Sequence, residues 1–168
     1  MNIRFSDRAS KEVTAQLNEV RKLGFRIALL PLGFASGHYD QFALRRVLKQ
    51  GDEGFWILRK PSVVDTTYLI SKSAAFIGTS LHGNIIAEAY GNPHLAIRYG
   101  DYTIPKLQKY LHTWEIGDLR TVVDVEHISK SLRAAVNIPR GLISDNSTRL
   151  RQLVYENFDR IFEVIEQE

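Results

Sequence analysis

The residues best suited to chemistry in this chain lie in one short segment, Thr79-Ser80-Leu81-His82-Gly83. An apolar stretch precedes the segment and a helical pattern from Asn84 to Ala89 follows it, which predicts a loop between a strand and a helix. An imidazole can donate a proton, and hydroxyls and backbone N–H groups at the start of a helix bind anionic oxygens. We therefore expect an anion site with His82 as the catalytic candidate. The binding candidates here are Thr79, Ser80 and Gly83.

Further polar residues follow two other predicted strands. They are His38 and Asp40 after the first long apolar run, Arg98 at the end of a later run, and Lys106 shortly after it. If the strands are parallel, their carboxyl ends open on one edge of the sheet, where ligands bind in such folds. We expect all four residues to lie at that edge beside His82. Asp40 also has an ordinary interpretation as a turn cap, and Lys106 one as a solvated surface lysine.

Glu88 lies within the helix that follows the His82 loop. A glutamate there can reach a sugar hydroxyl, although small neighbours such as Ala89 and Gly91 also suit plain close packing. His94, His112 and His127 have no neighbours that suggest ligation, and we expect them to be structural or at the surface. No residue is assigned to a metal, and no cofactor is expected.

Composition narrows the possible functions. The chain has 168 residues, 44% hydrophobic content and a formal charge of +3, which suit one domain with a real core. It has no cysteine, which excludes thiol catalysis, zinc–thiolate sites and iron–sulfur clusters. Lysine and arginine are scattered, so we expect no nucleic-acid partner. No apolar run is long enough to cross a bilayer, and a cytoplasmic location is the default expectation.

The order of elements predicts the fold. Strands are expected over residues 25–32, 55–58, 75–78, 95–99 and 121–123, with helices between them and a possible first strand over Asn2 to Phe5. The last helix is expected to start near Asp145 or Asn146, with Asn146-Ser147-Thr148 as its cap, and to have Val154, Phe158, Ile161 and Ile165 on its apolar face. This alternation is typical of a doubly wound, Rossmann-like parallel α/β sheet in a single domain, residues 1–168.

The common phosphate and hydrolase motifs are absent. The sequence has no GxxxxGK[ST] loop, no GxGxxG fingerprint, no HExxH and no GxSxG elbow. Instead, Gly78-Thr79-Ser80-Leu81-His82-Gly83 followed by Glu88-Ala89-Tyr90-Gly91-Asn92-Pro93 resembles the C-terminal half of polysaccharide pyruvyl transferases. Tyr99 and Lys106 fit the tyrosine that ends the next strand and the lysine that leads the next helix in that family. The similarity covers most of residues 1–120.

The resemblance implies the C-terminal lobe of a two-domain GT-B enzyme, whose missing N-terminal domain would complete the active-site cleft. It implies transfer of pyruvate from phosphoenolpyruvate to two hydroxyls of a sugar or lipid-linked glycan, in exopolysaccharide or cell-surface glycan synthesis. His82 would be the acid or the donor on the phosphate side, and Lys106 would add positive charge. Many family members carry arginine where this chain has Ser80, and Arg98 is a candidate to replace it. We expect the isolated lobe to be inactive.

Two alternatives stay open. The segment from Asn84 to Arg98 also resembles the nucleotide-sugar half of GT-B glycosyltransferases and of sugar-nucleotide 2-epimerases, where the glutamate at Glu88 would contact ribose or sugar. The chain could also be a non-enzymatic binding or scaffolding domain, because Ser80 departs from the family pattern. His82 in its SLHG loop, with Lys106 downstream, favours the pyruvyl transferase.

Overall fold

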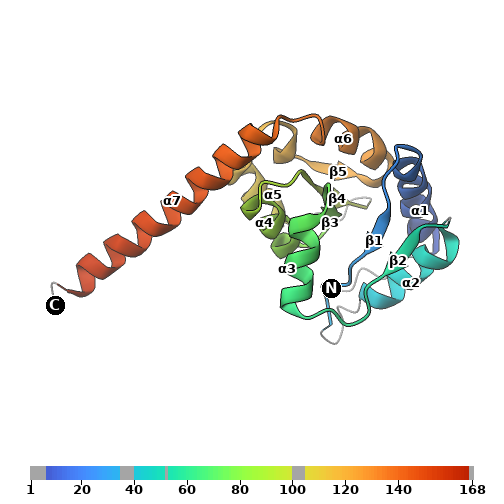
Figure 1. Cartoon of the computed structure of the whole chain (residues 1–168), viewed down its shortest axis with the longest axis horizontal. Helices are drawn as coiled ribbons and strands as arrows, with labels where there is room; N and C mark the ends of the chain where they lie inside the picture. The colour runs from blue at the N-terminus through green and yellow to red at the C-terminus, as the bar shows by residue number, and fades with distance from the viewer. Residues whose placement is uncertain (1–6, 35–39, 52, 100–104, 167–168) are drawn as a thin grey trace.

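The computed structural model describes residues 7–34, 40–51, 53–99 and 105–166 (Figure 1). The strands are β1 (Ile27–Leu29), β2 (Phe55–Ile57), β3 (Phe76–Gly78), β4 (His94–Arg98) and β5 (Val122–Asp124). The α-helices are α1 (Asp7–Lys22), α2 (Asp40–Gln50), α3 (Val63–Lys72), α4 (Leu81–Ala89), α5 (Pro105–Trp114), α6 (Ile128–Ala135) and α7 (Arg140–Ile165). Two short 3-10 helices, η1 (Gly117–Arg120) and η2 (Val125–His127), flank β5. The possible strand over Asn2 to Phe5 lies outside the described residues.

All strand pairs are parallel, as the alternation of strands and helices predicts. However, the strands form a two-stranded sheet, β1-β2, and a three-stranded sheet, β3-β4-β5, rather than the one continuous sheet we expected. The first apolar run supplies only a three-residue strand because Pro31 has no N–H for a ladder. Leu30 and Leu32 instead pack beside Ile70, Phe76 and Ala87, so the run still contributes to the core.

The main core joins both sheets. Leu29 of β1 and Leu95 and Ile97 of β4 belong to one buried cluster, with Val20 of α1 and Leu132 of α6. The apolar spacing of α1 and α6 predicts these helices because it places their apolar side chains on one face. The two short sheets are therefore held in one mixed α/β unit by side-chain packing.

Helix α7 differs most from the sequence prediction. It begins at Arg140, right after Pro139, and not near Asn146. The apolar side chain of Ile143 is fully buried in the main core. Its burial stabilises a helical first turn that begins before Asn146. Asn146 lies well inside α7, so the prediction that it caps the helix is wrong.

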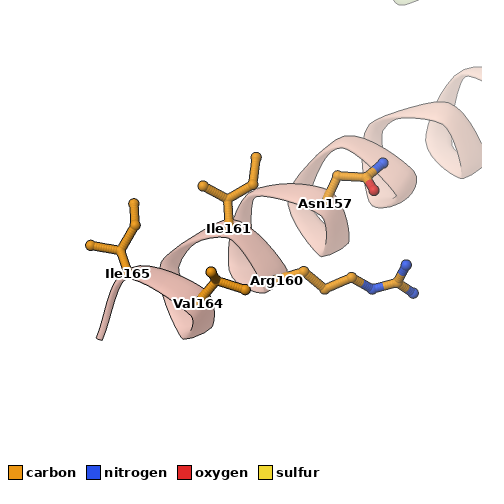
Figure 2. A pocket seen from close by; sticks show the side chains of 5 residues that line it. All are labelled: Asn157, Arg160, Ile161, Val164 and Ile165. Carbon is orange, nitrogen blue, oxygen red and sulfur yellow. The ribbon is translucent and has the colours of Figure 1, made fainter. Parts of the chain in front are cut away.

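The outer part of α7 projects away from the rest of the domain (Figure 1). Its exposed apolar side chains include Val154, Phe158, Ile161 and Ile165. Figure 2 shows an open depression lined by Asn157, Arg160, Ile161, Val164 and Ile165. Because all five belong to one helix, the depression is a feature of the helix surface and encloses no ligand site. Within the described ranges, no helix has the length and apolar character needed to span a membrane.

Candidate functional site

Helix α4 starts where the sequence places the His82 loop. Ser80 is the N-cap, and its Oγ accepts a hydrogen bond from the Gly83 N–H at 3.2 Å. The Ser80 carbonyl accepts from both the backbone N–H and the side-chain amide of Asn84, at 3.1 and 2.8 Å. In the first turn, the N–H groups of Leu81 and His82 have no partner within the helix, so they can bind an anion.

The loop is shaped by close packing of Gly83 on Phe76. A Cβ built on Gly83 would lie 2.3 Å from Phe76 Cζ, well inside van der Waals contact. Only glycine therefore lets α4 approach the first residue of β3 this closely. This packing turns His82 outward, where its side chain is exposed, while Thr79 is half-buried between strand and helix.

The N-terminal turn of α5 lies beside that of α4. Leu81, the first residue of α4, packs against a buried cluster of Ala96, Leu107 and Leu111. Lys106 directly precedes Leu107 and is exposed. The helix dipole also places partial positive charge at this end of the helix, so it does not stabilise the lysine. Two helix starts and one ammonium group thus favour negative charge at this end of the domain.

Arg98 reaches the same end from β4. Its side chain leaves the strand on the face of Ala96, because side chains two residues apart in a strand share a face. The guanidinium binds Asp124 of β5 through two bonds, Nε to Oδ1 at 2.7 Å and an Nη2 bond to Oδ2 at 3.2 Å. Arg98 and Asp124 are register partners at the ends of their strands. The ion pair lowers the pKa of Asp124 and holds the arginine at the strand end.

The loop after β1 is only partly described. His38 lies outside the described residues. Asp40 is the first residue of α2, and its Oδ2 accepts from the backbone N–H groups of Leu32 and Gly33, at 3.1 and 2.7 Å. The carboxylate therefore closes the turn after β1, as the turn-cap interpretation predicts. Since β1 belongs to the other sheet, register alone does not place Asp40 beside His82.

Glu88 lies apart from the His82 loop, in the interior. It is 2% exposed, and its Oε1 accepts a hydrogen bond from Asn146 Nδ2 at 2.6 Å. Glu88, His94 and Glu115 each have an atom that could bind a metal ion. These three atoms lie within 4.8 Å of one another. His94 and Glu115 are also buried, and His94 Nε2 lies 3.2 Å from Glu115 Oε1. We call these three residues the interior cluster.

The interior cluster shifts the pKa values of Glu88, His94 and the neighbouring Tyr110. Burial, together with the charge of Glu115, raises the pKa of Glu88 to about 7. Burial alone would lower the pKa of His94, but the adjacent Glu115 carboxylate outweighs it and the pKa is raised. Burial also raises the pKa of Tyr110, and the two carboxylates raise it further. Glu88, His94 and Tyr110 therefore stay protonated at pH values at which exposed carboxylates are ionised.

Sequence reasoning missed the interior cluster because its members are far apart in the chain. One signal was present: His94 begins a strand that is otherwise apolar, Leu95-Ala96-Ile97, and a histidine buried there needs a polar partner. The partners come from α4 and from the residue after α5, which no spacing rule connects to His94.

Comparison with known families gives one match. The sequence model of the family described as polysaccharide pyruvyl transferase matches residues 5–102, which is more than half of the 168 residues. The matched range includes the α4 loop with His82 and ends after Arg98, whereas Lys106 and Glu115 follow it. A comparison with curated proteins and one with solved structures gave no match.

Proposed function

The chain belongs to the polysaccharide pyruvyl transferase family, and from this premise we propose that it serves transfer of pyruvate from phosphoenolpyruvate to a sugar hydroxyl pair. The product is a ketal on a sugar or lipid-linked glycan in exopolysaccharide or cell-surface glycan synthesis. One observation carries the assignment of the site. Leu81 packs on the Ala96–Leu107–Leu111 cluster, which brings the start of α4 against β4 and α5.

The donor has two anionic groups, a phosphate and a carboxylate. The first-turn N–H groups of α4 and the hydroxyl of Thr79 would bind one of them, while Lys106 supplies positive charge and Arg98, paired with Asp124, supplies a guanidinium donor. Ser80 supports this turn by capping Gly83, and Gly83 by its contact with Phe76. Asp124 helps because it fixes the guanidinium of Arg98, which we propose stands in for the arginine that many family members have at the position of Ser80.

The reaction needs a proton at the enol methylene and stabilisation of the cation that develops at the ketal carbon. We assign the proton to His82, whose exposed imidazole lies in the first turn of α4. One sugar hydroxyl then adds to the cationic carbon and loses its proton. The second hydroxyl replaces the phosphate, and its proton goes to the departing inorganic phosphate, while the proton of the first hydroxyl returns to His82, so that atoms and charges balance. A donor of this kind implies a cytoplasmic location.

We further propose that the chain is the C-terminal lobe of a longer GT-B protein and is inactive alone. The outer part of α7 supports this, because Val154, Phe158, Ile161 and Ile165 form one apolar stripe that is exposed. Such a stripe is suited to contact with a second domain. Self-association of the chain through α7 would remove this support, and ketal formation by the 168 residues alone would refute the proposal.

The nucleotide-sugar alternative is weaker in this geometry. It requires Glu88 to contact ribose or sugar, whereas that carboxylate is buried and hydrogen-bonded to Asn146. A thermal-shift comparison of phosphoenolpyruvate, UDP and UDP-sugars tests the choice. We expect phosphoenolpyruvate to raise the melting temperature of the chain. A rise with UDP compounds only would favour the nucleotide-sugar lobe, and no rise with any ligand would favour the non-enzymatic domain.

A further inference from the structure

We propose that Glu88, His94 and Glu115 bind a single divalent transition-metal ion inside the domain. This interior cluster joins the end of α4, the start of β4 and the residue that follows α5. It is distinct from the α4–α5 end that carries His82 and Lys106, and it does not depend on the proposed function. The sequence alone predicted no metal ligand.

The spacing of the ligand atoms fits one ion. The chosen atoms of the three residues lie within 4.8 Å of one another. Nitrogen and carboxylate oxygen bind zinc at about 2.0–2.2 Å, so donors on opposite sides of an ion lie up to about 4.4 Å apart. Binding of one ion therefore requires the two glutamate side chains to move toward His94.

The surrounding hydrogen bonds already orient the ligands. His94 Nδ1 lies 3.1 Å from the Asn92 carbonyl, which can only accept, so Nδ1 carries a proton and Nε2 faces the carboxylates. Histidines that bind metals commonly donate their other N–H to a backbone carbonyl in this way. Asn146 Nδ2 donates to Glu88 Oε1, and Glu88 Oε2 is buried without a hydrogen-bond partner among the described residues. The tautomer and one carboxylate are thus set without a metal.

The remaining buried polar atoms of the cluster form no well-aligned hydrogen bond within the described ranges, although His94 Nε2 lies 3.2 Å from Glu115 Oε1. Glu88 Oε2, His94 Nε2 and both carboxylate oxygens of Glu115 have no aligned hydrogen-bond partner among the residues that the structure describes. Their residues are 2%, 0% and 1% exposed, so water cannot readily replace the missing bonds. A buried charge without compensation is very costly. A divalent cation would balance two ionised carboxylates beside a neutral histidine, and its binding would release the protons that the metal-free cluster holds.

The donor set favours a first-row transition ion such as Zn²⁺ or Mn²⁺. One imidazole and two carboxylates combine the borderline and hard ligands that these ions accept, whereas Mg²⁺ and Ca²⁺ prefer all-oxygen sites that keep water. If Glu115 binds through both oxygens, the site has four donors, which suits a closed structural ion. The ion would fix α4 to β4 and so stabilise the elements that position His82 and Arg98.

Metal content and thermal stability of the 168-residue chain test the proposal. Chain treated with EDTA and dialysed would be titrated with Zn²⁺, Mn²⁺ and Mg²⁺, followed by elemental analysis. We expect about one transition ion per chain. At about a hundredfold excess of ion over Kd, we expect the melting temperature to rise by about 5–10 °C. Mg²⁺ should leave it nearly unchanged.

The variants Glu115→Gln and Glu126→Gln form the matched pair, since Glu126 is an exposed glutamate outside the interior cluster. Glu115→Gln should lose the bound ion and the temperature rise, whereas Glu126→Gln should keep both. The visible spectrum of wild type loaded with Co²⁺ tests ligation even if Glu115→Gln does not fold. Absence of stoichiometric metal and of a Co²⁺ spectrum distinct from hydrated Co²⁺, or equal binding by Glu115→Gln, would overturn the proposal.

Discussion

The side-chain amide of Asn146 donates to Glu88 Oε1 at 2.6 Å, across a separation of 58 residues. The bond joins the inner part of α7 to the last turn of α4. Ser147 adds a second link through its hydroxyl, which donates to the Ala89 carbonyl at 3.2 Å. Arg149 in turn donates to Asn146 Oδ1 at 2.7 Å, so the amide is held from both sides. Polar contacts therefore attach α7 to the domain at a buried point.

Replacement of Asn146 by alanine is expected to destabilise the chain by about 1–3 kcal/mol, because a buried carboxylate loses its donor. Asn157→Ala is the control, since Asn157 lies on the exposed part of α7 and bonds only to the Leu153 carbonyl in the contacts described. Urea unfolding would measure both variants. Equal losses of unfolding free energy would show that the Asn146–Glu88 bond does not stabilise the packing of α7 on the domain.

Replacement of Gly83 by alanine is expected to destabilise the chain by about 1–3 kcal/mol, the usual cost of overpacking a core. The reason is the 2.3 Å approach of the added Cβ to Phe76 Cζ. Gly141→Ala in α7 is the matched control, because its Cβ meets nothing within 4 Å and should stabilise by roughly 0.5–1 kcal/mol. A second change, Phe76→Leu, should recover part of the Gly83→Ala loss, and failure to do so would locate the cost elsewhere.

The stability of the metal-free chain is expected to fall as the pH rises from about 5 to 8. Folding raises the pKa of Glu88 from 4.5 to about 7, so the folded state binds this proton more tightly than the unfolded state does. Stability is greatest while the carboxyl is protonated and is lost as the pH rises through this window. The raised pKa of His94 acts in the same direction.

Urea unfolding in EDTA at about pH 5 and about pH 8 measures this change in the free energy of unfolding. Glu115, His94, Tyr110 and Asn146 are the titratable or polar groups around the Glu88 carboxyl. Glu88→Gln should have a clearly weaker pH dependence than wild type, whereas the exposed Glu156→Gln should keep it. A wild-type chain that is more stable at pH 8 than at pH 5 would show that Glu88 does not titrate as its burial implies.

Most of the fold could be predicted from the sequence because its signals are local. Apolar runs at β1 and β4, and the helical spacing of Val13, Leu17 and Val20, depend only on neighbouring residues. The split into two sheets could not be predicted, since strand pairing depends on side chains that meet across the core. The start of α7 was missed for the same reason, because burial of Ile143 extends the helix toward Pro139.

The candidate site likewise combines local features, which the sequence predicts, with long-range contacts, which it does not. The position of His82 where strand gives way to helix follows from a short segment, and the structure confirms it, with Ser80 as the N-cap of α4. The ion pair of Arg98 with Asp124 depends on the register of two strands. The interior position of Glu88 depends on Asn146 and Glu115, which lie far along the chain. Long-range contacts therefore account for what the sequence did not reveal.

Arg98→Ala is expected to weaken phosphoenolpyruvate binding by about tenfold, because a charged donor at the end of β4 is lost. Arg26→Ala, an exposed arginine just before β1, should leave the affinity unchanged. Isothermal titration of both variants with phosphoenolpyruvate measures this difference. Equal effects of the two changes would mean that Arg98 serves only its ion pair with Asp124.

The most direct test of the central claim is the affinity of the chain for phosphoenolpyruvate when His82 is replaced. Isothermal titration would compare wild type, His82→Ala and His112→Ala, whose histidine is exposed in the last turn of α5. The loss of a charge-assisted hydrogen bond, about 1.5–3 kcal/mol, should weaken binding by about tenfold or more in His82→Ala. His112→Ala should bind as wild type does, and equal affinity of all three proteins would contradict a donor site at the start of α4.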